Sequence, residues 1–289
     1  MKVIDESFVK ANLPLRPDDA NKGTMGTLVN ISGSYSMAGA CILSSMSALR
    51  SGVGLLKVAL PKSIYEIVAS LAYEAVFLPL DESENGTVDI RSLDYLLEVS
   101  RKSTAVLLGC GLSLCDDTVD FVREFIKACT TKVLLDADGI NAISLNTNVL
   151  KQCSCDMVLT PHPKEMSRLC KKSVEYIESN REEVATQFAK EYGVTLVLKG
   201  KDTLVTNGQD VYVNKTGNSS MAKGGSGDVL SGIISSLMAQ GVDPFKASCM
   251  GVYIHGLSGD LSARDLSKTS AVPRDIVEYL PKVYKILER

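Results

Sequence analysis

The chain has 289 residues, enough for one large α/β domain or two small ones, and 45% of them are hydrophobic, so it can bury a sizeable core. It carries 34 acidic and 31 basic residues with no block of Lys and Arg, which argues against a nucleic-acid partner. No apolar run approaches the roughly 18 residues that a membrane span needs, and acidic residues are scattered through the opening stretch, so we expect no signal peptide, no membrane partner and a cytoplasmic protein.

Short apolar runs and helical stretches alternate after a polar segment, residues 1–22, that we expect to follow the surface. The predicted strands are 26–31, 55–60, 75–78, 105–108, 133–135, 157–159, 195–198, 204–206 and 211–213. The last two flank Asn207-Gly208, a typical hairpin turn. The predicted helices are 37–49, 89–101, 118–129, 174–191, 228–240, 244–266 and 273–287.

The strands are too continuously apolar to be half exposed, and most are separated by helices. This pattern is typical of a central, mostly parallel sheet with helices on both faces, a three-layer αβα architecture. No linker rich in Pro, Gly or Ser interrupts the chain, so we expect a single domain over residues 1–289.

Polar and glycine residues follow the predicted strands at the point where each strand ends. They are Ser32-Gly33, Gly109-Cys110-Gly111, Asp136, Thr160-Pro161-His162 and Lys199-Gly200. In open α/β sheets, ligands bind at the carboxyl ends of the strands. We therefore expect these residues to converge on one site.

A glycine-rich stretch, residues 214–232, joins the end of a strand to the start of a helix. Gly224, Gly225 and Gly227 leave backbone N–H groups open to a ligand, and a helix N-terminus favours a phosphoryl group. We interpret the stretch as an anion hole with the Asp228 carboxylate beside it. A glycine turn in which Asp228 only caps the helix is an equally simple explanation.

The eight cysteines form no Cys-x-x-Cys pair, and the chain has only two histidines, His162 and His255, so we predict no metal site of that kind. The closest cysteine pairs are Cys110 with Cys115 and Cys153 with Cys155. Most of the cysteines lie in apolar surroundings and are expected to be reduced core residues.

The glycine-rich stretch resembles the anion-hole motif of ribokinase-like small-molecule kinases, and most of the chain is similar to the NAD(P)H-hydrate dehydratase family. The segments that carry the resemblance are 33–40, 108–112, 135–141, 159–165, 198–203 and 252–260. The chain departs from the family at Cys110, where proline is usual, and at Ser219, Ser220 and Lys223.

The resemblance implies a hydro-lyase for metabolite repair that returns the S-epimer of hydrated NADH or NADPH (NADHX, NADPHX) to NADH or NADPH. ADP or ATP would phosphorylate the ring hydroxyl with Mg²⁺ present, and phosphate would then be eliminated, leaving AMP and phosphate when ADP is used. Asp228 would accept or orient the hydroxyl proton, and the N–H groups from Gly225 to Gly227 would stabilise the transferring group.

The resemblance also assigns binding residues, each of which has a simpler structural explanation. Those assigned to the hydrated nicotinamide are Ala40, Gly111 (or Gly109), His162 and Asp228. Those assigned to the adenine nucleotide are Lys199, Gly200, Lys201, Asp202, Thr203 and Gly227. No protein ligand to metal is assigned, although an acidic loop, Asp136, Asp138 and Asn141, could hold Mg²⁺ through water. The simpler explanation is close helix packing for Ala40, a charged turn for residues 199–203, a surface loop for His162, and a solvated loop or helix cap for the acidic residues.

Two other functions are compatible with the same residues: a ribokinase-like vitamin-precursor kinase that stops at the phosphorylated product, and a non-catalytic sensor of adenine nucleotides. By resemblance we also expect a homo-oligomer, a tetramer, and functional pairing with a separate NAD(P)HX epimerase. The resemblance to the bacterial-type proteins favours ADP over ATP, although no residue decides it, and no residue decides between NADHX and NADPHX.

Overall fold

The computed structural model describes residues 1–288, in which ten strands form one sheet in the order β1-β10-β9-β8-β7-β6-β5-β2-β3-β4. The strands are β1 (Lys2–Ile4), β2 (Thr27–Ile31), β3 (Leu55–Pro61), β4 (Val76–Leu80), β5 (Ala105–Leu108), β6 (Lys132–Leu135), β7 (Met157–Leu159), β8 (Thr195–Leu198), β9 (Leu204–Thr206) and β10 (Val211–Asn214). All neighbours are parallel except β9, which is antiparallel to β8 and to β10.

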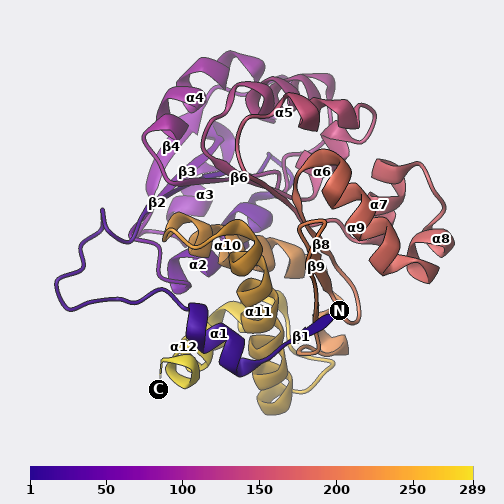
Figure 1. Ribbon diagram of the computed structural model, residues 1–289. Coiled ribbons are helices and arrows are strands. Elements are labelled where there is room, and N and C mark those ends of the chain that lie inside the picture. Colours follow the sequence, from indigo (N-terminus) through magenta and orange to yellow (C-terminus); the bar gives the residue numbers. More distant parts are fainter. Residues whose placement is uncertain (289) are drawn as a thin grey trace.

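Helices cover both faces of the sheet (Figure 1). One face carries α1 (Glu6–Asn12), α2 (Ala38–Arg50), α3 (Tyr65–Ala69), α10 (Ser226–Ala239), α11 (Pro244–Leu266) and α12 (Pro273–Leu287). The other face carries α4 (Leu93–Arg101), α5 (Asp116–Ala128), α6 (Asp138–Ile143), α7 (Pro163–Cys170), α8 (Val174–Ser179) and α9 (Arg181–Tyr192). Short 3-10 turns are η1 (Lys62–Ile64), η2 (Ile90–Ser92), η3 (Thr147–Gln152) and η4 (Ser219–Met221). The predicted three-layer αβα architecture is confirmed.

The central strands are apolar on both sides because each side packs against helices. In β2, Leu28 faces the core under α2 and α10, whereas Val29 and Ile31 face the core under α4 and α5. Each fully buried side chain of this kind stabilises the fold by about 1.5–3 kcal/mol. The buried amide of Asn30 is the polar exception, and it donates to Ser44 Oγ (2.9 Å) and Ser45 Oγ (3.0 Å) on α2.

The order of the strands reverses between β2 and β5. From β2 the chain proceeds outward through β3 to β4, then returns to β5 and proceeds the other way through β6, β7 and β8. Such a switch point opens a crevice at the carboxyl ends of the strands. The loops after β2, β5, β6, β7 and β8 all leave the sheet at this edge, which is where the sequence places the candidate residues.

Helix α10 lies between α2 and α11 and is buried along nearly its whole length (Figure 1). Close packing against α2 depends on Gly232, because a Cβ there would lie 2.0 Å from Ser47 Oγ and 2.2 Å from the Ser44 carbonyl oxygen. The helix therefore holds its first turn at the crevice with little freedom to move.

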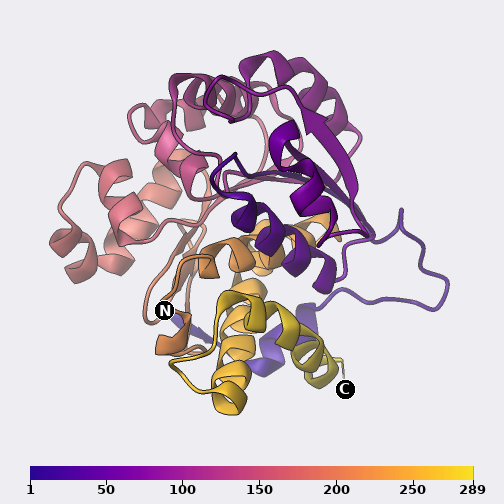
Figure 2. The same ribbon diagram turned by 180° about the vertical axis from the view of Figure 1, so that it is seen from behind.

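Several local predictions were wrong. Residues 1–22 contain β1, which pairs with β10, and α1, whose Phe8 and Val9 enter the core. Residues 174–191 form two helices, α8 and α9, that meet at Asn180. Helices α3, α6 and α7 had not been predicted. The segment from 15 to 24, which is exposed at nearly every residue, projects from the body (Figure 2).

Within residues 1–288, no helix combines the length and the apolar character that crossing a bilayer requires.

Candidate functional site

The first turn of α10 offers bare backbone amides. Gly225 is its N-cap residue, with φ +97°, and no side chain caps the helix. Within the described chain, the N–H groups of Gly227 and Asp228 donate to no backbone carbonyl. Lys223, the nearest cation in the stretch, turns away and donates to the carbonyls of Thr269 and Ala271. The turn therefore leaves N–H donors available to an anion.

Asp228 lies at this turn, close to two other groups. One ligand atom each from Asp228, Asp136 and Cys110 lie within 4.8 Å of one another. Burial, followed by the nearby Asp136 carboxylate, raises the pKa of Asp228 to about 6. Burial also raises the pKa of the Cys110 thiol, so that Cys110 stays neutral beside the two acids. Asp228 is thus a carboxylate that can exchange a proton near neutral pH.

Asp136, at the end of β6, is buried and fully partnered. Lys199 Nζ lies 2.7 Å from its Oδ1, and Ser231 Oγ donates to its Oδ2 at 2.7 Å. Burial is the largest influence and would raise the pKa of Asp136, but the charge of Lys199 and the hydrogen bonds from Lys199, Thr160 and Ser231 together lower that pKa. Lys199 Nζ is also 3.9 Å from Glu165 Oε2, and burial raises the pKa of Glu165. This ion pair fixes the loops after β6 and β8 to α10.

The three glycines at the turn face different surroundings. A Cβ at Gly227 would lie 3.4 Å from Lys199 Nζ and 3.7 Å from Asp136 Oδ2, so its α-carbon faces the ion pair. A Cβ at Gly224 would meet nothing within 4 Å. A Cβ at Gly225 would lie 2.6 Å from Leu43 Cδ1, so the α-carbon of Gly225 faces the α2 helix and not the open side.

The residues assigned to the hydrated nicotinamide come from neighbouring loops. Gly111, with φ +64°, lies against Ala40, because a Cβ on it would be 2.7 Å from the Ala40 Cβ. Gly109 instead packs on the backbone after β6, where a Cβ would lie 1.9 Å from the Asp136 carbonyl oxygen. Of the two glycines, Gly111 is therefore the one beside Ala40, and Gly109 has a structural reason to be glycine.

His162 is the N-cap of α7. Its Nδ1 accepts from the N–H groups of Lys164 (3.1 Å) and Glu165 (3.3 Å), and Glu165 Oε2 accepts from the His162 N–H at 2.8 Å. Burial, and then the charge of Lys199, lowers the pKa of His162. Glu165 thus takes part in a capping box at the start of α7. The imidazole is neutral and half exposed, and its Nε2, the nitrogen not used for capping, lies 3.4 Å from Glu165 Oε1.

The side chains of the turn assigned to the nucleotide, residues 199–203, differ in exposure and in the partners they bind. Lys199 points inward to the ion pair, whereas Lys201 is exposed. Asp202, with φ +56°, pairs with Lys215 at 3.0 Å. Thr203 Oγ1 donates to the Gly200 carbonyl at 2.9 Å. A nucleotide at this turn would contact Lys201 and backbone groups, and Lys199 would lie on the buried side of the turn, paired with Asp136.

The residues considered for Mg²⁺ do not form an all-oxygen cage. Both oxygens of Asp136 have partners already, and Asp138 Oδ2 accepts from the Ser113 N–H at 2.9 Å. Cys110 offers sulfur, which Mg²⁺ does not favour. Asp228 remains as an oxygen ligand. Because Mg²⁺ usually keeps several waters and binds through substrate phosphates, these residues fit an ion that is held together with a nucleotide.

Two residues of the site were not identified from the sequence: Ser231, which donates to Asp136, and Glu165, which lies beside Lys199. Ser231 lies three residues after Asp228, so both are on one face of α10, and this spacing could have indicated it. His255 is buried in α11, where burial lowers its pKa to about 4.

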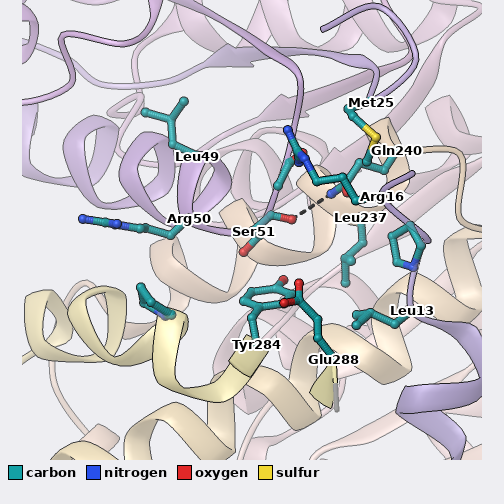
Figure 3. Close-up of a pocket in the computed structure, with 13 residues that line it drawn as sticks. Leu13, Arg16, Met25, Leu49, Arg50, Ser51, Leu237, Gln240, Tyr284 and Glu288 are labelled. Carbon is teal, nitrogen blue, oxygen red and sulfur yellow. Dashed lines mark hydrogen bonds between the residues drawn. The ribbon is translucent and has the colours of Figure 1, made fainter. Parts of the chain in front are cut away.

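A cavity of about 290 Å³ lies at the opposite edge of the sheet (Figure 3). It is lined by residues before β2 and β3 and after α10, among them Met25, Ser51 and Gln240, with Tyr284 from α12. Gln240 Nε2 donates to the Ser51 carbonyl across its upper wall at 2.8 Å. None of the residues assigned to the site lines this cavity.

Comparison with known proteins gives a consistent result. A family model for NAD(P)H-hydrate dehydratase matches residues 28–282. The bifunctional NAD(P)H-hydrate repair enzyme Nnr of Moorella thermoacetica is 36% identical over 99% of this chain and 54% of its own length. The chain thus spans about half the length of that relative. The ADP-dependent (S)-NAD(P)H-hydrate dehydratase of Bacillus subtilis is 30% identical over 98% of both chains.

A solved structure indicates the same family as the sequence comparisons. The crystal structure of the ADP/ATP-dependent NAD(P)H-hydrate dehydratase from Bacillus subtilis, co-crystallised with ATP and Mg²⁺, superposes with a TM-score of 0.84 at 27% identity. The match covers 99% of this chain and 98% of the other.

Proposed function

This chain belongs to the NAD(P)H-hydrate dehydratase family, and from that premise we propose that it dehydrates the S-epimer of hydrated NADH or NADPH with ADP or ATP as phosphoryl donor. One observation carries the proposal. A carboxylate whose pKa lies near 6, Asp228, stands beside uncapped amides at the crevice, where Ala40 and Gly111 also meet. These are the parts that phosphoryl transfer to a ring alcohol requires.

In the first step, the ring hydroxyl oxygen attacks the terminal phosphorus, and the bond from phosphorus to the leaving nucleotide breaks. Asp228 takes the hydroxyl proton. The N–H groups of Gly227 and Asp228 stabilise charge on the transferring oxygens. The phosphate ester then breaks at its C–O bond, phosphate leaves with the electron pair, and loss of a ring proton restores the double bond. With ADP the other product is AMP.

Mg²⁺ bound with the nucleotide would neutralise phosphate charge in this step. Besides the proton acceptor and the amides, the chain contributes positioning. The ion pair between Lys199 and Asp136 holds α10 against the loops, and Ser231 completes it.

The remaining assignments also belong to this proposal. Residues 1–289 act as one domain, in the cytoplasm, as a homotetramer that works with a separate epimerase. Relatives named as bifunctional repair enzymes support the pairing with an epimerase.

The test is an NADH-recovery assay. The purified protein is mixed with hydrated NADH, Mg²⁺ and either ADP or ATP, and the absorbance of the dihydronicotinamide is followed. We expect recovery that depends on the nucleotide. Accumulation of a phosphorylated small molecule without recovery would favour a kinase. Tight nucleotide binding without consumption would favour a sensor.

A further inference from the structure

Three cysteines gather at the edge of the sheet opposite to Asp228. Cys129 ends α5 just before β6, Cys153 follows η3, and Cys155 precedes β7 by two residues. They precede β6 and β7, whereas the residues of the candidate site follow the strands, and the proposed function does not use them.

Two of these thiols are in direct contact. Cys153 Sγ lies 3.1 Å from Cys155 Sγ, and both side chains are only half buried, so that a small molecule in solution can reach them. Cys129 is fully buried, and its thiol donates to the Thr131 carbonyl at 3.5 Å. The accessible pair is therefore Cys153 with Cys155.

The two sulfurs differ in reactivity. Hydrogen bonding from the Cys155 thiol lowers the pKa of Cys153. Hydrogen bonding to Cys129, and then to Cys153, raises the pKa of Cys155. Because the thiolate is the nucleophile, Cys153 is the sulfur that attacks first, and Cys155 remains a thiol beside it.

We propose that Cys153 and Cys155 form a modification site at which a peroxide reversibly oxidises the pair to a disulfide. The Cys153 thiolate attacks one peroxide oxygen, the O–O bond breaks, and the leaving oxygen takes a proton as water or alcohol. The resulting sulfenic acid is attacked by Cys155, the S–S bond forms, and water leaves. Two electrons pass from the two thiols to the peroxide, and a dithiol reductant returns them.

A soft metal ion is the competing occupant of three thiols. The geometry disfavours it, because within residues 1–288 the three sulfurs do not all come within 4.8 Å of one another, a spacing that Cys110, Asp136 and Asp228 do satisfy. The chain bends at Cys155, and the 3.1 Å between the two sulfurs is short enough for an S–S bond to form after a small movement.

The experiment uses the full, folded chain. The protein is exposed to hydrogen peroxide, its remaining thiols are alkylated, and tryptic peptides are mapped by mass spectrometry. The peptide 152–164 contains Cys153 and Cys155 and no other cysteine, so their disulfide is seen as an unalkylated peptide that has lost two hydrogens. We expect this species first, and its loss after dithiothreitol. Cys170 is the internal control, because it is also half buried but burial raises its pKa to about 11.

Two variants separate the roles. Cys155→Ser should leave Cys153 as a sulfenic acid that dimedone traps, and Cys153→Ser should leave Cys155 unoxidised at the same dose. Oxidation of Cys170 as fast as the pair, a bond between Cys129 and Cys155, direct formation of sulfinic acid at Cys153, or zinc binding with no response to peroxide would each overturn the proposal. The wild-type map decides even if a variant fails to fold.

Discussion

The carboxyl group of Asp228 shows how one residue can suit the chemistry and oppose folding. Desolvation and a neighbouring acid raise its pKa from 3.8 to about 6, so its ionised form is a better proton acceptor than a surface aspartate. The same effects make that ionised form costly to bury. Two predictions follow from the single group, one for turnover and one for stability.

Asp228→Asn keeps the shape of the side chain and removes the proton acceptor. We expect turnover in the NADH-recovery assay to fall by roughly 10²–10⁴, the usual contribution of a positioned base, with nucleotide binding largely kept. Asp94→Asn removes an equal charge from an exposed position on α4 and should change neither. Near-normal turnover of the Asp228 variant would exclude Asp228 from the mechanism.

The same variant should be more stable at neutral pH. An acid whose folded pKa is raised binds its proton more tightly when folded, so its penalty is absent below pH 3.8 and grows until the pH exceeds about 6. Asp228→Asn should therefore raise the free energy of unfolding at pH 7 by about 1–3 kcal/mol, and the gain should vanish near pH 4. Urea titrations at both pH values measure it. An equal gain at both would point to another cause.

Lys199 offers a third prediction at this scale. Lys199→Met should leave the Asp136 carboxylate buried without a cation, with only neutral partners such as Ser231 and the Cys110 thiol. We expect a loss of about 3 kcal/mol or more in the free energy of unfolding. Lys199→Met combined with Asp136→Asn removes both charges and should lose less than the single change. A double variant less stable than Lys199→Met would contradict the coupling.

At the scale of elements, helix α7 links the fold to the candidate site. Its N-cap residue is His162, and the reciprocal bonds between His162 and Glu165 satisfy the first amides of the helix. A histidine at this position could thus be required for capping, for binding, or for both. The two roles use different ring nitrogens and can be separated.

His162→Ala should lose about 1 kcal/mol of stability, the usual value of an N-cap, and should weaken substrate binding. His162→Asn restores a capping oxygen but removes Nε2, so we expect near-normal unfolding with a raised KM for hydrated NADH. Thermal unfolding and steady-state kinetics of both variants test this. If the Asn variant has a normal KM, the histidine only caps.

The elements could be predicted where periodicity was strong. The strands from β2 to β10 and the helices α10, α11 and α12 were predicted closely, because long apolar runs and helical spacing depend little on context. The N-cap residue of α6, Ala137, has φ +48°, and β1 has three residues that pair only with β10. Such elements are determined by tertiary contacts, which a single sequence does not contain.

The site was predictable in its location and less so in its contacts. Residues that follow parallel strands must share one edge, so Asp136 and Lys199 could be placed together in advance. Their direct pairing could not, because β7 lies between their strands and side-chain direction decides it. Gly225 was assigned to the anion hole, yet its α-carbon packs on Leu43. A branched residue there would disturb packing before it reached a phosphate.

At the scale of the whole molecule, the sheet ends at β4, beside a group of exposed apolar side chains. Ile67, Leu71 and Tyr73 are each more than half exposed, and Val76 lies on the edge strand itself. Monomeric proteins rarely expose such groups together. This edge is therefore where we expect the proposed oligomer to be held.

Leu71→Lys should convert the oligomer to a smaller species, because a charge would be buried in the contact. Light scattering after gel filtration measures the mass. Leu145→Lys is the matched control, since Leu145 is also exposed but lies far along the chain near η3. A wild-type protein that is already monomeric, or equal effects of both changes, would contradict the prediction.

The pairing of Asp136 with Lys199 leaves the crevice with an unbalanced negative charge whenever Asp228 has lost its proton. A triphosphate or diphosphate brings several more negative charges to the same place, and the amides of α10 can offset only part of them. The bare anion should therefore be repelled, and the nucleotide should enter as its complex with a divalent counter-ion. Electrostatic repulsion would then require the divalent ion to bind the nucleotide before the nucleotide enters the crevice.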